Sequence, residues 1–121
     1  MTRADLRLIA DLIPTDSRVL DLGCGDGQLL RLLEGKGCRG TGVEIEAEPY
    51  LAALRQGVNV IDLDINSQLD QFADDSYDVV VLSGTLQNVR LPALVLREIG
   101  RIAQHGIISM PNFVHWRNRL R

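Results

Sequence analysis

The chain has 121 residues, 45% of them hydrophobic and 24% charged, which is typical of a single globular domain and excludes disordered and fibrous proteins. Its formal net charge is −3, and Arg117, Arg119 and Arg121 are the only charges after residue 110, so residues 1–110 sum to −6 and a nucleic-acid-binding surface is disfavoured. No apolar run approaches the roughly 18 residues of a membrane span and no signal-peptide core is present, so we expect a cytoplasmic protein without membrane contact.

Two cysteines, Cys24 and Cys38, have neither CxxC spacing nor clustered histidines beside them. This arrangement predicts two free thiols, with no zinc site and no redox pair.

Short apolar runs alternate with helical patterns along the chain. Thr2 and Asp5 form a capping pair for a first helix that ends before Pro14. The predicted strands are residues 18–22, 39–43, 58–62, 77–83 and 106–110, and the further predicted helices are residues 28–36, 49–56 and 92–102, with a short helical turn near residues 69–72. His105 is expected in the turn before the last strand. This alternation predicts an α/β fold, a parallel sheet with helices on both faces.

The most informative stretch is residues 19–27, VLDLGCGDG. A buried strand there enters a tight turn with glycine at every second position, and a helix follows. In open parallel sheets such a turn brings backbone close to a nucleotide-like ligand at the carboxyl ends of the strands. The other strand ends expected to share this crevice are Glu44, residues 62–65 and residues 83–87.

Glu44 follows the first glycine by about 20 residues, the spacing at which an acid binds ribose hydroxyls. A nicotinamide dinucleotide would use the same architecture, but two details argue against it. The spacing is G-x-G-x-G rather than G-x-G-x-x-G. Asp21 and Asp26 would also repel a pyrophosphate, because residues 19–30 contain no lysine or arginine to offset their charge. A cationic, phosphate-free adenosine such as S-adenosylmethionine fits better, and an oxidoreductase fragment remains the weaker alternative.

Residues 19–27 resemble the first motif of class I S-adenosylmethionine-dependent methyltransferases, and the match extends through Glu44, Asp64 and residues 77–80 (YDVV). Within that superfamily the chain most resembles the methionine-biosynthesis MetW family. The segments that carry this closer match are residues 42–45 (GVEI), 57–61 (GVNVI), 82–87 (LSGTLQ) and 110–117 (MPNFVHWR).

The resemblance implies a Rossmann-like sheet of five parallel strands in the order 3-2-1-4-5, within a single S-adenosylmethionine-binding domain over residues 1–121. It also implies a cofactor site for S-adenosylmethionine or S-adenosylhomocysteine. Backbone at Gly23, Cys24 and Gly25 would face the methionine half with Asp21 near its ammonium, and Glu44 would bind the ribose. Asp64 would accept from the adenine amino group between Ile45 and Ile65, and Ser83 would close the methionine end. The family context further implies homoserine O-acyltransferase as a partner.

Several alternatives stay open. The chain stops soon after the fifth predicted strand, so we expect the usual C-terminal antiparallel strands to be absent and substrate recognition to be truncated with them. The exposed strand edge would then be covered by residues 111–121 or by a second copy, as a homodimer. His115 and Trp116 are expected beyond the crevice end of that strand, and Gly84 replaces an expected Gln. Because no general base is evident, the chain is either a methyltransferase or a non-catalytic acyltransferase subunit.

Overall fold

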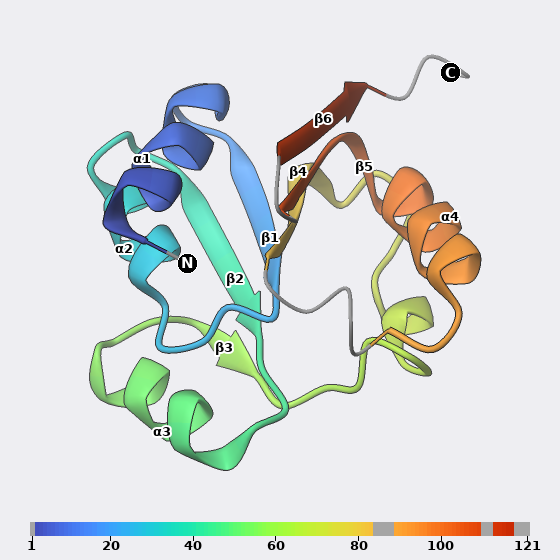
Figure 1. The fold of residues 1–121 in the computed structure, drawn as a ribbon, viewed down its shortest axis with the longest axis horizontal. Coiled ribbons are helices and arrows are strands. Elements are labelled where there is room, and N and C mark those ends of the chain that lie inside the picture. Colours follow the sequence, from blue (N-terminus) through green and yellow to red (C-terminus); the bar gives the residue numbers. More distant parts are fainter. Residues whose placement is uncertain (1, 84–88, 110–112, 118–121) are drawn as a thin grey trace.

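A computed structural model of the chain describes residues 2–83, 89–109 and 113–117, the last range through its backbone. Within these residues one sheet has the strand order β3-β2-β1-β4-β5-β6 (Figure 1). Its strands are β1 (Arg18–Leu22), β2 (Arg39–Val43), β3 (Val60–Ile61), β4 (Tyr77–Ser83), β5 (Ala103–Ser109) and β6 (Phe113–Arg117). The pairs from β3 through β5 are all parallel, which confirms the five parallel strands and their order.

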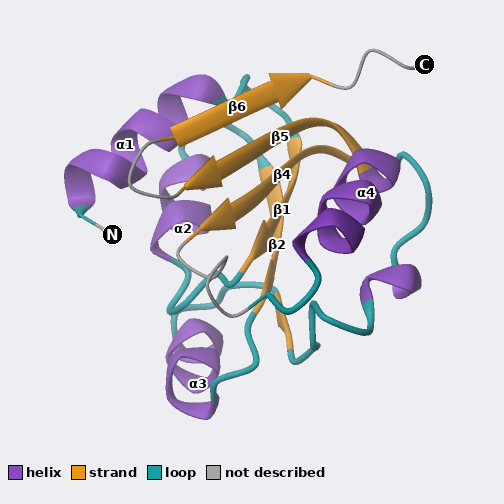
Figure 2. Cartoon of the chain, turned by 45° about the vertical axis from the view of Figure 1, so that its right-hand side comes forward, coloured by secondary structure: helices purple, strands orange, loops and turns teal. Residues whose placement is uncertain are grey.

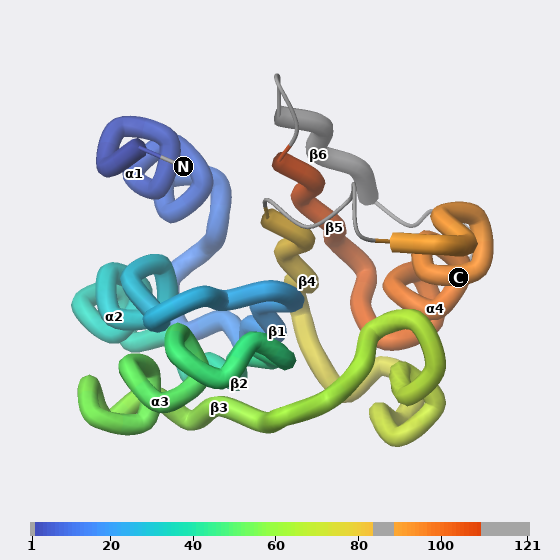
Figure 3. Tube along the Cα trace, turned by 60° about the horizontal axis from the view of Figure 1, so that its bottom comes forward, coloured from blue at the N-terminus to red at the C-terminus, as the bar shows by residue number. Residues whose placement is uncertain are grey.

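Helices cover both faces of the sheet, as predicted. One face carries α1 (Arg3–Leu12), α2 (Gln28–Glu34) and α3 (Ala47–Arg55), and the other carries α4 (Pro92–Ile102) with the 3-10 turn η1 (Leu69–Gln71) (Figures 1 and 3). Since side chains alternate along a strand, Val79 and Val81 of β4 join the core under α1 and α2. Val80 and Leu82 of the same strand join the core under α4.

Three boundaries differ from the prediction. β3 is confined to Val60–Ile61 because its pairing with β2 covers only this pair of residues. β5 begins at Ala103, so His105 lies within a strand, opposite Val79, and the prediction that it occupies a turn is wrong. α3 begins at Ala47 rather than Pro49. A proline is tolerated in the first turn of a helix because an N–H there would make no intrahelical hydrogen bond.

The expectation that the usual C-terminal antiparallel strands would be absent is wrong for β6. β6 pairs antiparallel with β5, with Ser109 opposite Phe113 and His105 opposite Arg117 (Figure 2). Residues 113–117 therefore cover the β5 edge, which confirms one of the two expected ways of protecting it. His115 lies opposite Ile107, alongside β5 rather than beyond its end.

The Arg101 guanidinium of α4 holds the connection between β3 and β4 in place. Arg101 donates from Nη1 to the Phe72 carbonyl at 2.7 Å and to Asp74 at 2.8 Å, and from Nη2 to the Leu69 carbonyl at 3.1 Å. Its Nε donates to Glu98 at 2.8 Å. These bonds fix the segment after residue 68 against the helix. Among the described residues, none of the helices has both the length and the hydropathy needed to cross a membrane.

Candidate functional site

The glycine turn between β1 and α2 is attached to the end of β2 through its own amides. Gly23 N and Cys24 N both donate to the Val43 carbonyl, at 2.8 and 3.0 Å, and Gly27 N donates to the Cys24 carbonyl at 3.0 Å. The Gly25 amide donates to Glu44 Oε1. Because these four amides are bonded within the protein, they are not available to cradle a phosphate in the way that a glycine-rich phosphate loop does.

The structure assigns different roles to two glycines that the sequence pattern treats alike. Gly25 has φ +59°, and a methyl group built on it would meet no atom of the described residues within 4 Å, its two chain neighbours aside. A methyl group built on Gly27 would lie 2.5 Å from Val58 Cγ2. Gly27 therefore permits close packing of α2 against the segment before β3, whereas Gly25 leaves open space above the turn where a ligand can approach.

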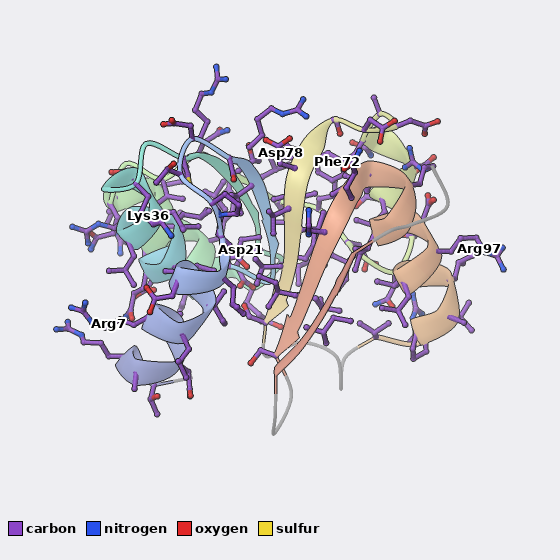
Figure 4. All side chains as sticks on the ribbon, turned by 90° about the horizontal axis from the view of Figure 1, so that it is seen from above. Arg7, Asp21, Lys36, Phe72, Asp78 and Arg97 are labelled. Atoms are coloured by element: carbon purple, nitrogen blue, oxygen red, sulfur yellow. The ribbon has the colours of Figure 1, made fainter. Side chains whose placement is uncertain are left out.

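Asp21 is a buried acid in the centre of the sheet, only 1% exposed. Its partner among the described residues is the Ser83 hydroxyl, which donates to Oδ1 at 3.4 Å from the end of β4. Burial, opposed by this hydrogen bond and assisted by the negative charge of Glu44, raises the pKa of Asp21 to about 7. The N-cap of α2 is Gly27, which has no side-chain cap, so Asp21 does not cap the helix. In Figure 4 Asp21 lies in the interior, whereas Arg7 and Arg97 project outward.

Glu44 leaves the end of β2 beside the glycine turn and is 8% exposed. Its Oε1 accepts a hydrogen bond from Gly25 N at 2.8 Å, and its Oε2 accepts one from Glu46 N at 3.0 Å. The spacing of Glu44 from the first glycine predicted its place in the crevice but not its bond to the turn. The predicted strand order already places the first and second strands side by side. This is the signal that could have indicated the Glu44–Gly25 hydrogen bond.

The side chain of Cys24, predicted to line the cofactor site, belongs to the core under α1 and α2. Its Sγ would lie 2.5 Å from a methyl group built on Gly42, and its thiol donates to the Gly25 carbonyl at 3.5 Å. Burial, with nearby carboxylates, raises the pKa of this thiol to about 12. Its backbone is therefore the part that can contact a ligand, and both cysteines are free and buried.

The turn after β3 presents Asp64 and Ile65, both half-buried. Asp64 Oδ1 accepts a hydrogen bond from Asn66 N at 2.9 Å, and Asp64 N donates to Gln68 Oε1 at 2.7 Å. The Asn66 side chain accepts a bond from Arg90 N at 2.9 Å, which joins this turn to the segment before α4. Ile65 packs against the α4 core. Sequence reasoning had not identified these supporting amides.

The predicted site residues thus gather at one edge of the sheet, in the last residues of β1 and β4 or on the turns that follow β1, β2 and β3 (Figure 1). Ile45, beside Glu44, is 57% exposed. Residues 84–87, the remainder of the fourth strand end with Gly84, lie outside the described residues, as do Met110 and Pro111. A cavity of about 520 Å³ between α1, α2 and the end of α3 is separate from this edge, since it includes Asp26 but neither Asp21 nor Glu44.

The family described as "Methionine biosynthesis protein MetW" matches residues 3–121. The chain belongs to the MetW family. It is 42% identical over 120 residues to the "Bifunctional methionine biosynthesis protein MetXA/MetW" of Rhodopirellula baltica, covering 92% of this chain and 19% of that protein. It is 35% identical over 94 residues to the "Ubiquinone biosynthesis O-methyltransferase" of Aeromonas salmonicida, covering 74% of this chain and 40% of that protein. This MetW-family chain therefore spans less than half of either relative.

Solved structures show the same fold. A putative S-adenosyl-L-methionine-dependent methyltransferase from Methanococcus maripaludis has a TM-score of 0.75 at 20% identity, over 88% of this chain and 56% of that one. The [4+2]-cyclase SpnF has a TM-score of 0.72 at 25% identity, over 87% of this chain and 42% of that one. The class I methyltransferase fold is thus established for the MetW-family chain, and the cyclase illustrates that one fold hosts different chemistries.

Proposed function

We propose that this chain binds S-adenosylmethionine, or S-adenosylhomocysteine, at the carboxyl ends of β1, β2, β3 and β4. The observation that carries the proposal is Asp21, a buried carboxylate whose partner in the described part of the chain is a hydroxyl rather than a cation. A buried carboxylate is costly unless it is paired. The ammonium of the methionine half, close to the sulfonium, would supply the missing positive charge.

The surroundings of the turn also favour this ligand over a dinucleotide. Asp21 and Glu44 are both buried beside it, and the amides of the turn are bonded within the fold. A pyrophosphate would therefore meet negative charge and few free donors. A ligand that is cationic at this end and lacks phosphate meets neither obstacle.

The adenosine half fits the turns after β2 and β3. Each oxygen of Glu44 accepts one backbone bond and keeps a second acceptor position, which two ribose hydroxyls can use. Among the hydrogen bonds of the described residues, none reaches Asp64 Oδ2 or the Ile65 amide. These two groups match the amino donor and a ring-nitrogen acceptor of adenine, and the exposed Ile45 offers an apolar surface for the ring.

Calorimetry of the purified chain tests this proposal. We expect saturable binding of S-adenosylmethionine and S-adenosylhomocysteine and none of NADH. Asp64→Ala should weaken binding by about 1 to 3 kcal/mol through the lost hydrogen bond to adenine. Asp62→Ala is the matched control, because Asp62 is exposed and lies just before the same turn. A folded sample that binds neither sulfur ligand, or that prefers NADH, would contradict the proposal.

We infer a second role, as a partner subunit of homoserine O-acyltransferase. The observation that favours it is the R. baltica relative, in which one bifunctional protein carries a MetW-like part together with the part called MetXA. Such a fusion is what two cooperating proteins would form. Three further expectations stay predictions. They are self-association through the last strand or residues 111–121, a cytoplasmic location and the lack of nucleic-acid binding.

Co-purification distinguishes the two roles. If the chain is a partner subunit, it should elute with purified homoserine O-acyltransferase from the same source in gel filtration, without producing a methylated product. Turnover of S-adenosylmethionine on a small acceptor, with no complex, would favour an enzyme that acts alone. Both assays use the wild-type chain, since neither depends on variants.

A further inference from the structure

The Glu44 carboxylate is bonded to two loops at once. Its Oε1 holds the Gly25 amide at 2.8 Å and its Oε2 holds the Glu46 amide at 3.0 Å. The first bond reaches the glycine turn, which the proposed ligand would contact with its methionine half. The second bond fixes the peptide that follows the exposed Ile45, on the adenosine side.

Gly25 depends on this bond more than its neighbours do. Gly23 and Cys24 donate to the Val43 carbonyl, a backbone group of β2 that is in place whatever side chain follows it. The Gly25 amide is bonded to a side chain, and the residue has φ +59° with open space around its Cα. A glycine with so few contacts has many accessible conformations once its amide is released.

We propose that Glu44 is a positioning residue for the glycine turn in addition to a ribose-binding group, so that the two halves of the ligand are coupled through the Glu44–Gly25 hydrogen bond. Ribose hydroxyls on the carboxylate hold it in the rotamer that fixes Gly25, and an ordered turn holds the carboxylate ready for the ribose. Such coupling is reciprocal. It rests on the proposed binding of S-adenosylmethionine.

The test compares two ligands that share an adenosine half. S-adenosylhomocysteine contacts the turn with its amino acid, whereas 5′-methylthioadenosine lacks the amino acid. If Glu44 bound only ribose, Glu44→Ala would lower the affinity for both ligands by the same factor. We expect the loss for S-adenosylhomocysteine to be larger by about fivefold or more, the lower range of site-to-site coupling. Asp64→Ala, which removes an adenine contact, should weaken both equally. Equal losses in Glu44→Ala would overturn the proposal.

A measurement without ligand separates this inference from the proposed function. By NMR, amide exchange at Gly25 should accelerate in Glu44→Ala and remain slow in Asp64→Ala. Glu44→Gln should restore protection, since its carbonyl oxygen can still accept the Gly25 amide. Unchanged exchange at Gly25 in Glu44→Ala would overturn the positioning role even if the wild type binds S-adenosylhomocysteine. Faster exchange in a protein that binds neither ligand would leave positioning of the turn in place and refute the ligand coupling together with the proposed function.

Discussion

Binding of S-adenosylmethionine is expected to tighten as the pH rises from about 5 to about 7 and to release a proton, and Asp21→Asn should remove this dependence. The reason is burial, which raises the pKa of Asp21 to about 7 in the ligand-free protein. A cationic ligand prefers the ionised carboxylate, so it must displace the proton below that pH. The affinity should then change by up to about tenfold per pH unit.

Calorimetry in buffers with different ionisation enthalpies counts the released proton. The ligand's own ammonium titrates with either protein, so the difference between wild type and Asp21→Asn isolates Asp21. Ser83→Ala should move the midpoint to higher pH, since the Ser83 hydroxyl lowers the pKa of Asp21 by donating to it. The same proton release in wild type and Asp21→Asn would show that Asp21 does not face the ligand.

The same acid should shape stability in the absence of ligand. Between 3.8, the ordinary pKa of the carboxyl, and about 7, the folded state holds a proton that the unfolded state has lost. The contribution of Asp21 to the free energy of unfolding is therefore full below this interval and is lost as the pH rises through it, by at most about 4 kcal/mol. Denaturant titrations across this range should show the fall in wild type and not in Asp21→Asn.

A second large effect is expected at the glycine turn. Gly25→Ala should weaken the binding of S-adenosylhomocysteine by at least about tenfold, or about 1.4 kcal/mol. Apart from its chain neighbours, the added methyl group meets no atom within 4 Å in the part of the chain that the structure describes, so it would occupy the open space that the ligand needs. Its backbone at φ +59° adds strain of about 1 to 2 kcal/mol to the fold. Calorimetry and denaturant unfolding measure the two effects separately.

Gly57→Ala is the matched control. Gly57 has φ +79° and open space for a methyl group, as Gly25 has, but it ends α3 away from the strand ends. Both variants should lose similar stability, while only Gly25→Ala loses affinity. Equal affinity in the two variants would place the ligand elsewhere.

Local sequence determined most of the fold. The strands Arg18–Leu22, Arg39–Val43 and Tyr77–Ser83 and the helix Pro92–Ile102 have the predicted bounds, because apolar periodicity, glycine and proline specify them within a few residues. The capping box of Thr2 and Asp5 is present, with both bonds at 3.1 Å. The charge pattern of the glycine turn also needed no structure to argue against a phosphate ligand.

Tertiary structure decided what depends on neighbouring strands. β3 is short, β5 is long and β6 exists because pairing with a neighbour sets where a strand begins and ends, and no single segment of the sequence specifies its pairing. Likewise the burial of Asp21 beside Ser83 and the bond from Glu44 to Gly25 join residues far apart in the chain. The sequence could name these groups as a site, but only the packed sheet gave Asp21 its raised pKa and Glu44 its hold on the turn.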